Sequence, residues 1–141
     1  MEGWAALRNA AWAYPVLECL HLVGVALLIG NLVLFELRVL GLGRGIDIAP
    51  LARLALPLAV AGFLLAAMSG SLMFATRPGE LLTNPAFKWK LALLFVAGLN
   101  AALFHTRGSL QRADTLACVQ AAASALLWIS VLVCGRMIAY V

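Results

Sequence analysis

Residues 14–43 read YPVLECLHLVGVALLIGNLVLFELRVLGLG, and this stretch determines how the rest of the chain is interpreted. An apolar run of this length, opened by Pro15 and closed by charged residues and glycines, predicts a membrane-spanning helix over about 15–40. His21 lies about two turns inside its starting end. Because ionisable side chains are costly inside a bilayer, a histidine there marks either a functional site or a buried pair.

The composition indicates an integral membrane protein. Of the 141 residues, 65% are hydrophobic and 11% are charged, and the mean hydropathy is +1.02; soluble domains are nearer half apolar and a quarter charged. The net charge of +4 comes from basic residues scattered at helix ends, which is membrane flanking and not a nucleic-acid-binding surface. The three cysteines lie inside apolar runs without CxxC spacing, so we expect them to pack as small hydrophobic side chains.

Three further apolar segments extend the prediction to an all-α, four-helix transmembrane bundle without a separate soluble domain. Together with residues 15–40, the expected spans are about 51–76, 85–105 and 115–139. The second span is expected to begin near Leu51 or Leu54. Asn84 and Asp114 (or Thr115) are typical N-cap residues for the third and fourth spans.

Small residues and buried amides predict how the helices pack. Gly62, Ala66 and Gly70 are four residues apart, so they share one helix face and let a neighbouring helix approach closely. Asn31 and Asn100 are predicted to form hydrogen bonds between helices.

The N-terminal residues and the loops bear on membrane placement. Residues 1–13 predict a short interfacial helix, because Trp12 favours the headgroup level and Arg8 reaches water. Four spans put both termini on one side, here called side A; the opposite side is side B. Side A carries Arg8, Arg77, Lys88, Lys90 and Arg136, whereas side B carries Arg38, Arg44, Arg53, Arg107 and Arg112. If Lys90 and Arg136 belong to a buried site, side B has more positive charge, which predicts a cytoplasmic side B and periplasmic termini.

Two nitrogen bases, His21 and Lys90, are expected at similar depths in the membrane. His21 lies six residues past Pro15, about 9 Å along its helix, and Lys90 lies five residues past Pro85, about 8 Å along a helix of the same direction. His105 is roughly 30 Å along that second helix. His21 and Lys90 are therefore expected at matching depth near side A, and a haem held by both histidines is excluded if the helices are continuous.

Each of these residues also has a simpler interpretation. His21 fits a core histidine bonded to a carbonyl or to Glu18, which is three residues earlier on the same face. Lys90 fits a side chain that reaches up to the interface. Arg136 fits a terminal anchor, and His105 fits a residue at the side B interface near Glu36.

Several motifs carry a resemblance to known membrane proteins. They are CLHLVG at 19–24, ELRVLG at 36–41, GSLMF at 70–74, NPAF at 84–87 with Lys90, and Asn100 through Phe104-His105. In these the chain resembles a family of small, uncharacterised bacterial four-helix membrane proteins. The resemblance covers nearly the whole chain.

More remotely, the first helix and the start of the third are similar to the four-helix bacterial protoporphyrinogen oxidase and the membrane part of copper-resistance D proteins. That resemblance implies a b-type haem held by His21 and Lys90. The chain lacks the Trp-x-x-Gly pattern after the first-helix histidine and the histidine at the end of that helix, so the resemblance does not extend to protoporphyrinogen oxidation.

The sequence therefore predicts a bacterial inner-membrane protein that binds haem b through His21, with Lys90 as second ligand. Arg136, or Lys88 or Arg77, is expected to meet the propionates. The predicted role is membrane electron transfer or haem-linked redox chemistry, and whether it is enzymatic stays open. The alternative is a cofactor-free accessory subunit of a larger membrane complex, or a homo-oligomer, that docks through the small residues of 51–76.

Overall fold

The computed structural model describes residues 2–109 and 114–140, and these residues form helices and short connections without strands. Arg112, one of the side B charges, lies outside the described residues. The helices are α1 (Glu2–Asn9), α2 (Ala13–Val39), α3 (Ile48–Thr76), α4 (Pro78–Thr83), α5 (Pro85–Thr106) and α7 (Thr115–Met137). Of these, α2, α3, α5 and α7 are long and apolar enough to cross a membrane. The prediction of an all-α membrane bundle is confirmed.

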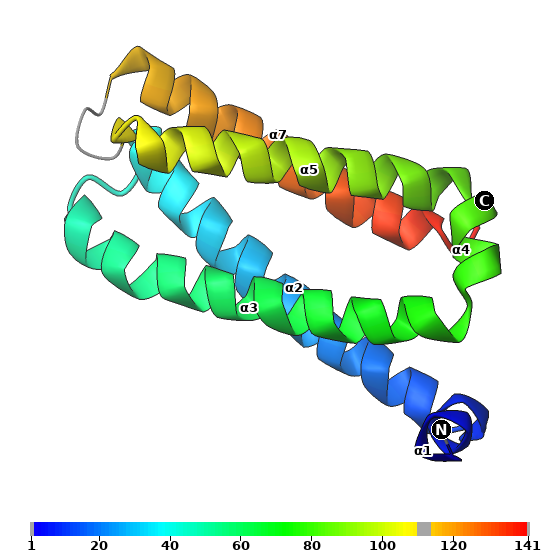
Figure 1. Ribbon diagram of the computed structural model, residues 1–141. Coiled ribbons are helices and arrows are strands. Elements are labelled where there is room, and N and C mark those ends of the chain that lie inside the picture. The colour runs from blue at the N-terminus through cyan, green and yellow to red at the C-terminus, as the bar shows by residue number, and fades with distance from the viewer. Residues whose placement is uncertain (1, 110–113, 141) are drawn as a thin grey trace.

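The helices run alternately up and down, and both chain ends lie at the same end of the bundle (Figure 1). α2 packs mainly on α3, and α5 packs mainly on α7, so the bundle consists of an α2–α3 hairpin and an α5–α7 hairpin. Contacts between α2 and α7 join the two hairpins. We call the end with the termini side A and the opposite end side B, as above. α1 lies within the segment 1–13 that was predicted to form a short interfacial helix. It is found at side A, beside the start of α2 (Figure 1).

Capping side chains fix where the later helices begin. Asn84 Oδ1 accepts hydrogen bonds from the backbone N–H groups of Ala86 and Phe87, and Asp114 Oδ1 accepts from Ala117. Both caps were predicted, and both satisfy backbone donors that have no partner inside the helix. α3 differs from its predicted start, because it begins at Ile48 and not near residue 51.

A close approach of backbones holds α2 against α3. A Cβ added at Gly24 would lie 2.6 Å from the Ala66 backbone nitrogen, and one added at Gly62 would lie 2.6 Å from the Gly24 carbonyl oxygen. Gly62 and Ala66 are buried, so the predicted small-residue face is confirmed. α2 therefore covers this face of α3.

The two predicted amides behave differently. Asn100 Nδ2 donates to the Gln120 carbonyl oxygen of α7 at 3.0 Å, which confirms an interhelical bond. Asn31 Nδ2 instead donates to Leu27 O at 2.7 Å within its own helix. The prediction for Asn31 was wrong, because its amide donates to a carbonyl one turn earlier in α2 and, within the described residues, to no other helix.

Candidate functional site

His21 lies in the groove between α2 and α3 near side A, where it is half-buried. Its Nδ1 is 2.9 Å from the carbonyl oxygen of Ala66 on α3. A carbonyl can only accept a hydrogen bond, so Nδ1 carries the hydrogen and Nε2 keeps its lone pair. Of the two partners that the sequence left open, the carbonyl is the one observed, and Glu18 is exposed.

Ser69 and Gly70 of α3 contact the imidazole ring of His21. The Ser69 hydroxyl donates to Leu65 O at 2.7 Å and lies 3.4 Å from His21 Nδ1. A Cβ added at Gly70 would lie 3.3 Å from His21 Cε1, so the ring rests directly on the backbone of α3. The tautomer and the ring position are therefore both set by α3.

Lys90 occupies the other hairpin. It lies on α5, half-buried, and its Nζ is 3.4 Å from the position that a Cβ would take at Gly135 of α7. Within the described residues no hydrogen bond joins Lys90 to His21. The two bases thus sit at the same end of the bundle, as predicted, but each packs against its own hairpin.

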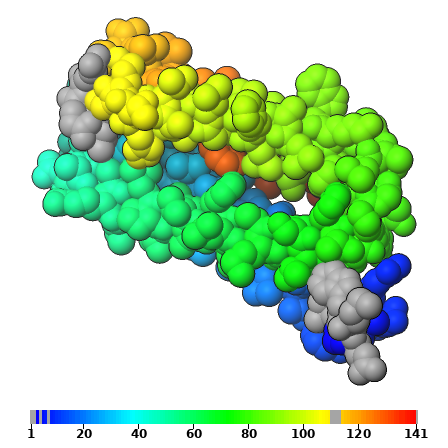
Figure 2. Space-filling model, in the orientation of Figure 1, coloured from blue at the N-terminus to red at the C-terminus, as the bar shows by residue number. Residues whose placement is uncertain are grey.

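A hollow lies between the two hairpins. Figure 2 shows it between α3 and α5, with parts of α2 and α7 visible at its floor. Two aromatic contacts cross between the hairpins: Phe74 stacks on Phe87 with centroids 5.7 Å apart, and Phe63 meets the edge of Trp128 at 6.4 Å. Along α3, Ser69 and Gly70 lie between these two contacts, so the His21 level is bracketed by aromatic pairs.

A cavity of about 200 Å³ lies at side A, along the line where α2 meets α3, here called the α2–α3 seam. It is lined by Arg8, Asn9, Ala13, Tyr14, Leu17, Thr76 and Arg77. The Arg77 guanidinium lies 4.8 Å from the centroid of the Tyr14 ring. Leu17 is one turn from His21 on the same helix face, so this cavity lies about one turn from the histidine in the direction of side A.

The other predicted cations lie apart from His21 and Lys90. Arg136 is exposed at the end of α7, where its Nη2 donates to the Tyr140 hydroxyl at 3.2 Å. Lys88 is exposed on the first turn of α5. His105 is exposed in the last turn of α5 at side B, against the edge of Phe104. The separation of His21 from His105 follows the predicted depths.

Gly24 lies three residues after His21 on α2 and does not leave an open surface beside it. Its Cα hydrogens instead face the backbone of Gly62 and Ala66, so that position is filled by α3.

Sequence reasoning missed Glu36, which is 4% exposed and turned into the bundle. Ser124 of α7 lies close to its carboxyl. A signal was present, because Glu36 and Arg38 are two residues apart and must point to different helix faces. Only one of them can reach the side B interface directly.

The described residues hold no group of three or more acidic, thiol or imidazole side chains placed around one ion. His21 offers a lone pair on Nε2, and Lys90 offers an amine across the hollow. This donor set suits a ligand that needs one or two nitrogen atoms.

Neither a family model nor a curated protein nor a solved structure matches the chain.

Proposed function

We propose that this protein is a b-type haem protein of the bacterial inner membrane that serves in electron transfer or haem-linked redox chemistry. The observation that carries the proposal is the bond from His21 Nδ1 to the Ala66 carbonyl oxygen, 2.9 Å long. Histidines that ligate metals almost always donate their other ring N–H to a carbonyl or carboxylate, which fixes the tautomer and raises the basicity of the ligating nitrogen. His21 has this arrangement without any acidic partner.

Lys90 is the proposed second ligand. It approaches from the opposite hairpin at the same depth, and its long side chain ends beside the glycine of α7. The amine must be neutral to ligate, which a desolvated lysine reaches more readily than an exposed one. The resemblance to four-helix haem-binding proteins points to the same two residues.

Arginines at side A suit the two carboxylates of a haem. Arg8 and Arg77 line the cavity on the α2–α3 seam, and guanidinium groups bind carboxylates through paired hydrogen bonds. Arg136 remains a candidate, because its side-chain partner among the described residues is the Tyr140 hydroxyl and not a carboxylate. A haem bound here would supply reversible one-electron chemistry, with a potential set by the axial ligands and by burial.

The absorption spectrum of detergent-purified protein from haem-replete cells tests the proposal. We expect a Soret band that His21→Ala abolishes, that Lys90→Met shifts, and that His105→Ala leaves intact. Colourless wild-type protein, or an unchanged spectrum in His21→Ala, would refute haem binding and favour a cofactor-free accessory subunit.

A matched pair of glycine variants sharpens this test. Gly70→Ala places a methyl group 3.3 Å from the His21 ring, whereas Gly135→Ala places one 3.4 Å from the tip of Lys90. The ring is pinned to Ala66 and cannot yield, but the lysine tip is flexible. We expect Gly70→Ala to weaken haem retention and Gly135→Ala to keep it. Equal retention in both variants would argue against His21 as the principal ligand.

A further inference from the structure

Glu36 is an ionisable side chain enclosed near the side B end of α2. It is 4% exposed and adjoins the apolar cluster of Phe35, Phe104 and Ala117. Ser124 of α7 lies close to its carboxyl, and Oε2 has no hydrogen-bond partner among the described residues. A buried carboxyl oxygen without a partner is costly and needs an explanation.

No cation on the surrounding helices compensates this carboxyl within the described part of the chain. The titratable side chains on this stretch of the four helices are Arg38 on α2, Arg53 on α3, His105 on α5 and Cys118 on α7. Arg38 bonds a loop carbonyl at 2.6 Å, and the Cys118 thiol bonds a carbonyl of α2 at 3.6 Å. Arg53 and His105 are exposed. The two ion pairs found in residues 2–109 and 114–140 lie elsewhere.

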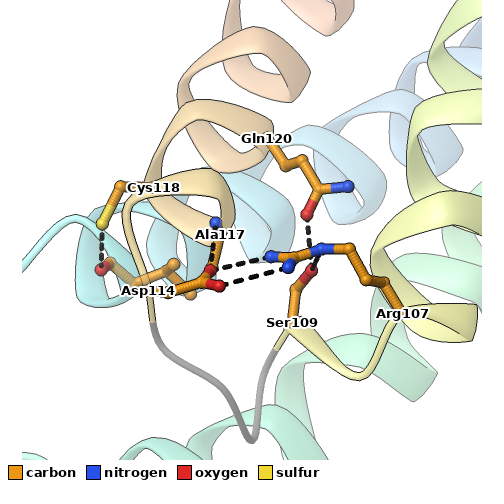
Figure 3. A network of polar contacts seen from close by, with 7 residues as sticks. Arg107, Ser109, Asp114, Ala117, Cys118 and Gln120 are labelled. Atoms are coloured by element: carbon orange, nitrogen blue, oxygen red, sulfur yellow. Dashed lines mark hydrogen bonds and ion pairs between the residues drawn. The ribbon is translucent and has the colours of Figure 1, made fainter.

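Polar side chains lead from this carboxyl toward side B. Ser124 and Gln120 are one turn apart on the same face of α7. Gln120 Oε1 accepts a hydrogen bond from the buried Ser109 hydroxyl, which in turn accepts from Arg107 Nε at 3.1 Å (Figure 3). Arg107 forms an ion pair with Asp114 at 2.7 Å, and the Asp114 side chain is 44% exposed.

A groove on the α5–α7 hairpin runs beside these side chains. It has a volume of about 650 Å³, and Asn100, Thr106, Arg107 and Gln120 are among its lining residues. The other lining residues are apolar, namely Leu103, Leu116, Val119 and Ala123, so water can be held only beside the polar side chains, where each molecule finds two or more partners. The polar side chains from Ser124 to Asp114 thus point the way from the buried carboxyl toward side B, and the groove lies beside Gln120 and Arg107 of this row.

We propose that Glu36 is a proton-binding site within the membrane that exchanges its proton with side B water along this polar row. The carboxylate takes up one proton that originates from hydronium at side B, becomes neutral, and returns the proton by the same route. The site therefore acts as a half-channel that opens to one side only. It goes beyond haem binding and does not depend on it.

A proton fits this site better than a metal cation does. Sodium-sized and larger cations require several oxygen ligands at once, whereas Glu36 and Ser124 supply one carboxyl and one hydroxyl. Gln120 is no free ligand, because its Oε1 already accepts from Ser109. A proton needs only the unpartnered Oε2.

Infrared difference spectra between acidic and alkaline buffer test the site in lipid nanodiscs. We expect a carbonyl band at the high frequency of a carboxylic acid in apolar surroundings, separate from the band of the exposed carboxyls that acid also protonates, and this band should shift in D₂O. Glu36→Gln should remove this band, and Glu18→Gln, which changes an exposed carboxyl on the same helix, should keep it. Absence of the band from wild type, or its persistence in Glu36→Gln, would overturn the proposal.

Carbodiimide labelling tests the same site without any substitution. Dicyclohexylcarbodiimide reacts with protonated carboxyl groups in apolar surroundings, so wild-type protein should carry an adduct on the peptide that contains Glu36. Its yield should fall as the pH rises. Mass spectrometry that finds no adduct on Glu36 at any pH would contradict the proposal even if Glu36→Gln fails to fold.

The route has a matched test on α7. Ser124→Ala removes the first group of the polar row, whereas Ser130→Ala removes a hydroxyl that bonds only Leu126 O of its own helix. We expect hydrogen–deuterium exchange of the Glu36 carboxyl to slow roughly tenfold in Ser124→Ala. A rise of about 1.4 kcal/mol in the free-energy barrier to proton exchange has this effect. Ser130→Ala should exchange at the wild-type rate, and equal rates in both variants would refute the route.

Discussion

The two hairpins of the bundle hold their helices together by different means. α2 and α3 touch through backbone at Gly24 and Gly62, where no side chain separates them. α5 and α7 are joined by side-chain hydrogen bonds, from Asn100 to Gln120 O at 3.0 Å and from Asn84 to Ile138 O at 2.9 Å. Backbone contact permits one arrangement, whereas longer polar side chains tolerate small shifts.

This difference decides how each hairpin presents its nitrogen base. His21 is fixed on the α3 backbone by Ala66 and Gly70, but Lys90 reaches along α7 through a flexible chain that ends near Gly135. A ligand bound between the hairpins would therefore meet one rigid and one adjustable group. This division of roles follows from packing, and the following substitutions test it in order of expected effect.

The largest effect is expected at the backbone contact. In Gly24→Ala the new Cβ would lie 2.6 Å from the Ala66 nitrogen and 2.7 Å from the Gly62 carbonyl oxygen. We expect the free energy of unfolding to fall by about 3 kcal/mol, because the α2–α3 backbones must separate. Chemical unfolding in detergent micelles, followed by circular dichroism, measures it.

Gly30→Ala is the matched control on the same helix. No atom lies within 4 Å of the Cβ position at Gly30, so the free energy of unfolding should stay level or rise slightly, since alanine favours helix. If both variants unfold alike, the close α2–α3 contact does not hold the hairpin together.

A smaller effect is expected in the α5–α7 hairpin. Asn100→Leu removes the bond to Gln120 and should lower the free energy of unfolding by about 1 kcal/mol, the usual size of such bonds in membranes. Asn31→Leu removes a bond within α2 only, so its effect should be near zero. The same unfolding assay applies, and a larger loss in Asn31→Leu would reverse our assignment of the interhelical amide.

The smallest effect concerns the loop that closes the α5–α7 hairpin. Hydrogen bonds from Arg107 hold the pKa of the Asp114 carboxyl well below its usual value, with a further contribution from the Ala117 N–H. Since the folded pKa is the lower one, the stabilisation is complete above about pH 4 and is lost as the pH falls through the folded pKa. The pair is partly exposed, so solvent screens it.

Asp114→Asn isolates this charge, because asparagine still caps α7. We expect the difference in Tm between wild type and Asp114→Asn to be present at about pH 7 and to shrink toward about pH 2. Thermal unfolding at both pH values, with added salt as a second condition, measures it. A difference that is constant across pH would show that the ion pair contributes nothing to the hairpin.

The sequence by itself determined the membrane class, the four helices and most of their ends. Long apolar runs leave few alternatives in a bilayer, because every backbone group must be bonded within a helix. Caps at Asn84 and Asp114 depend on neighbouring residues only, so local patterns predict them. The matching depth of His21 and Lys90 also followed from residue counts along rigid helices.

Tertiary structure alone decided which face of each helix turns inward and what each polar group meets. The apolar residues of a membrane helix occur on all of its faces, so they do not mark the buried one. For that reason the sequence did not distinguish Ala66 from Glu18 as the partner of His21, and it left Glu36 at the interface. The backbone contact of α2 with α3 sets the rotation of α2, and that rotation places His21 on a carbonyl and Glu36 in the core.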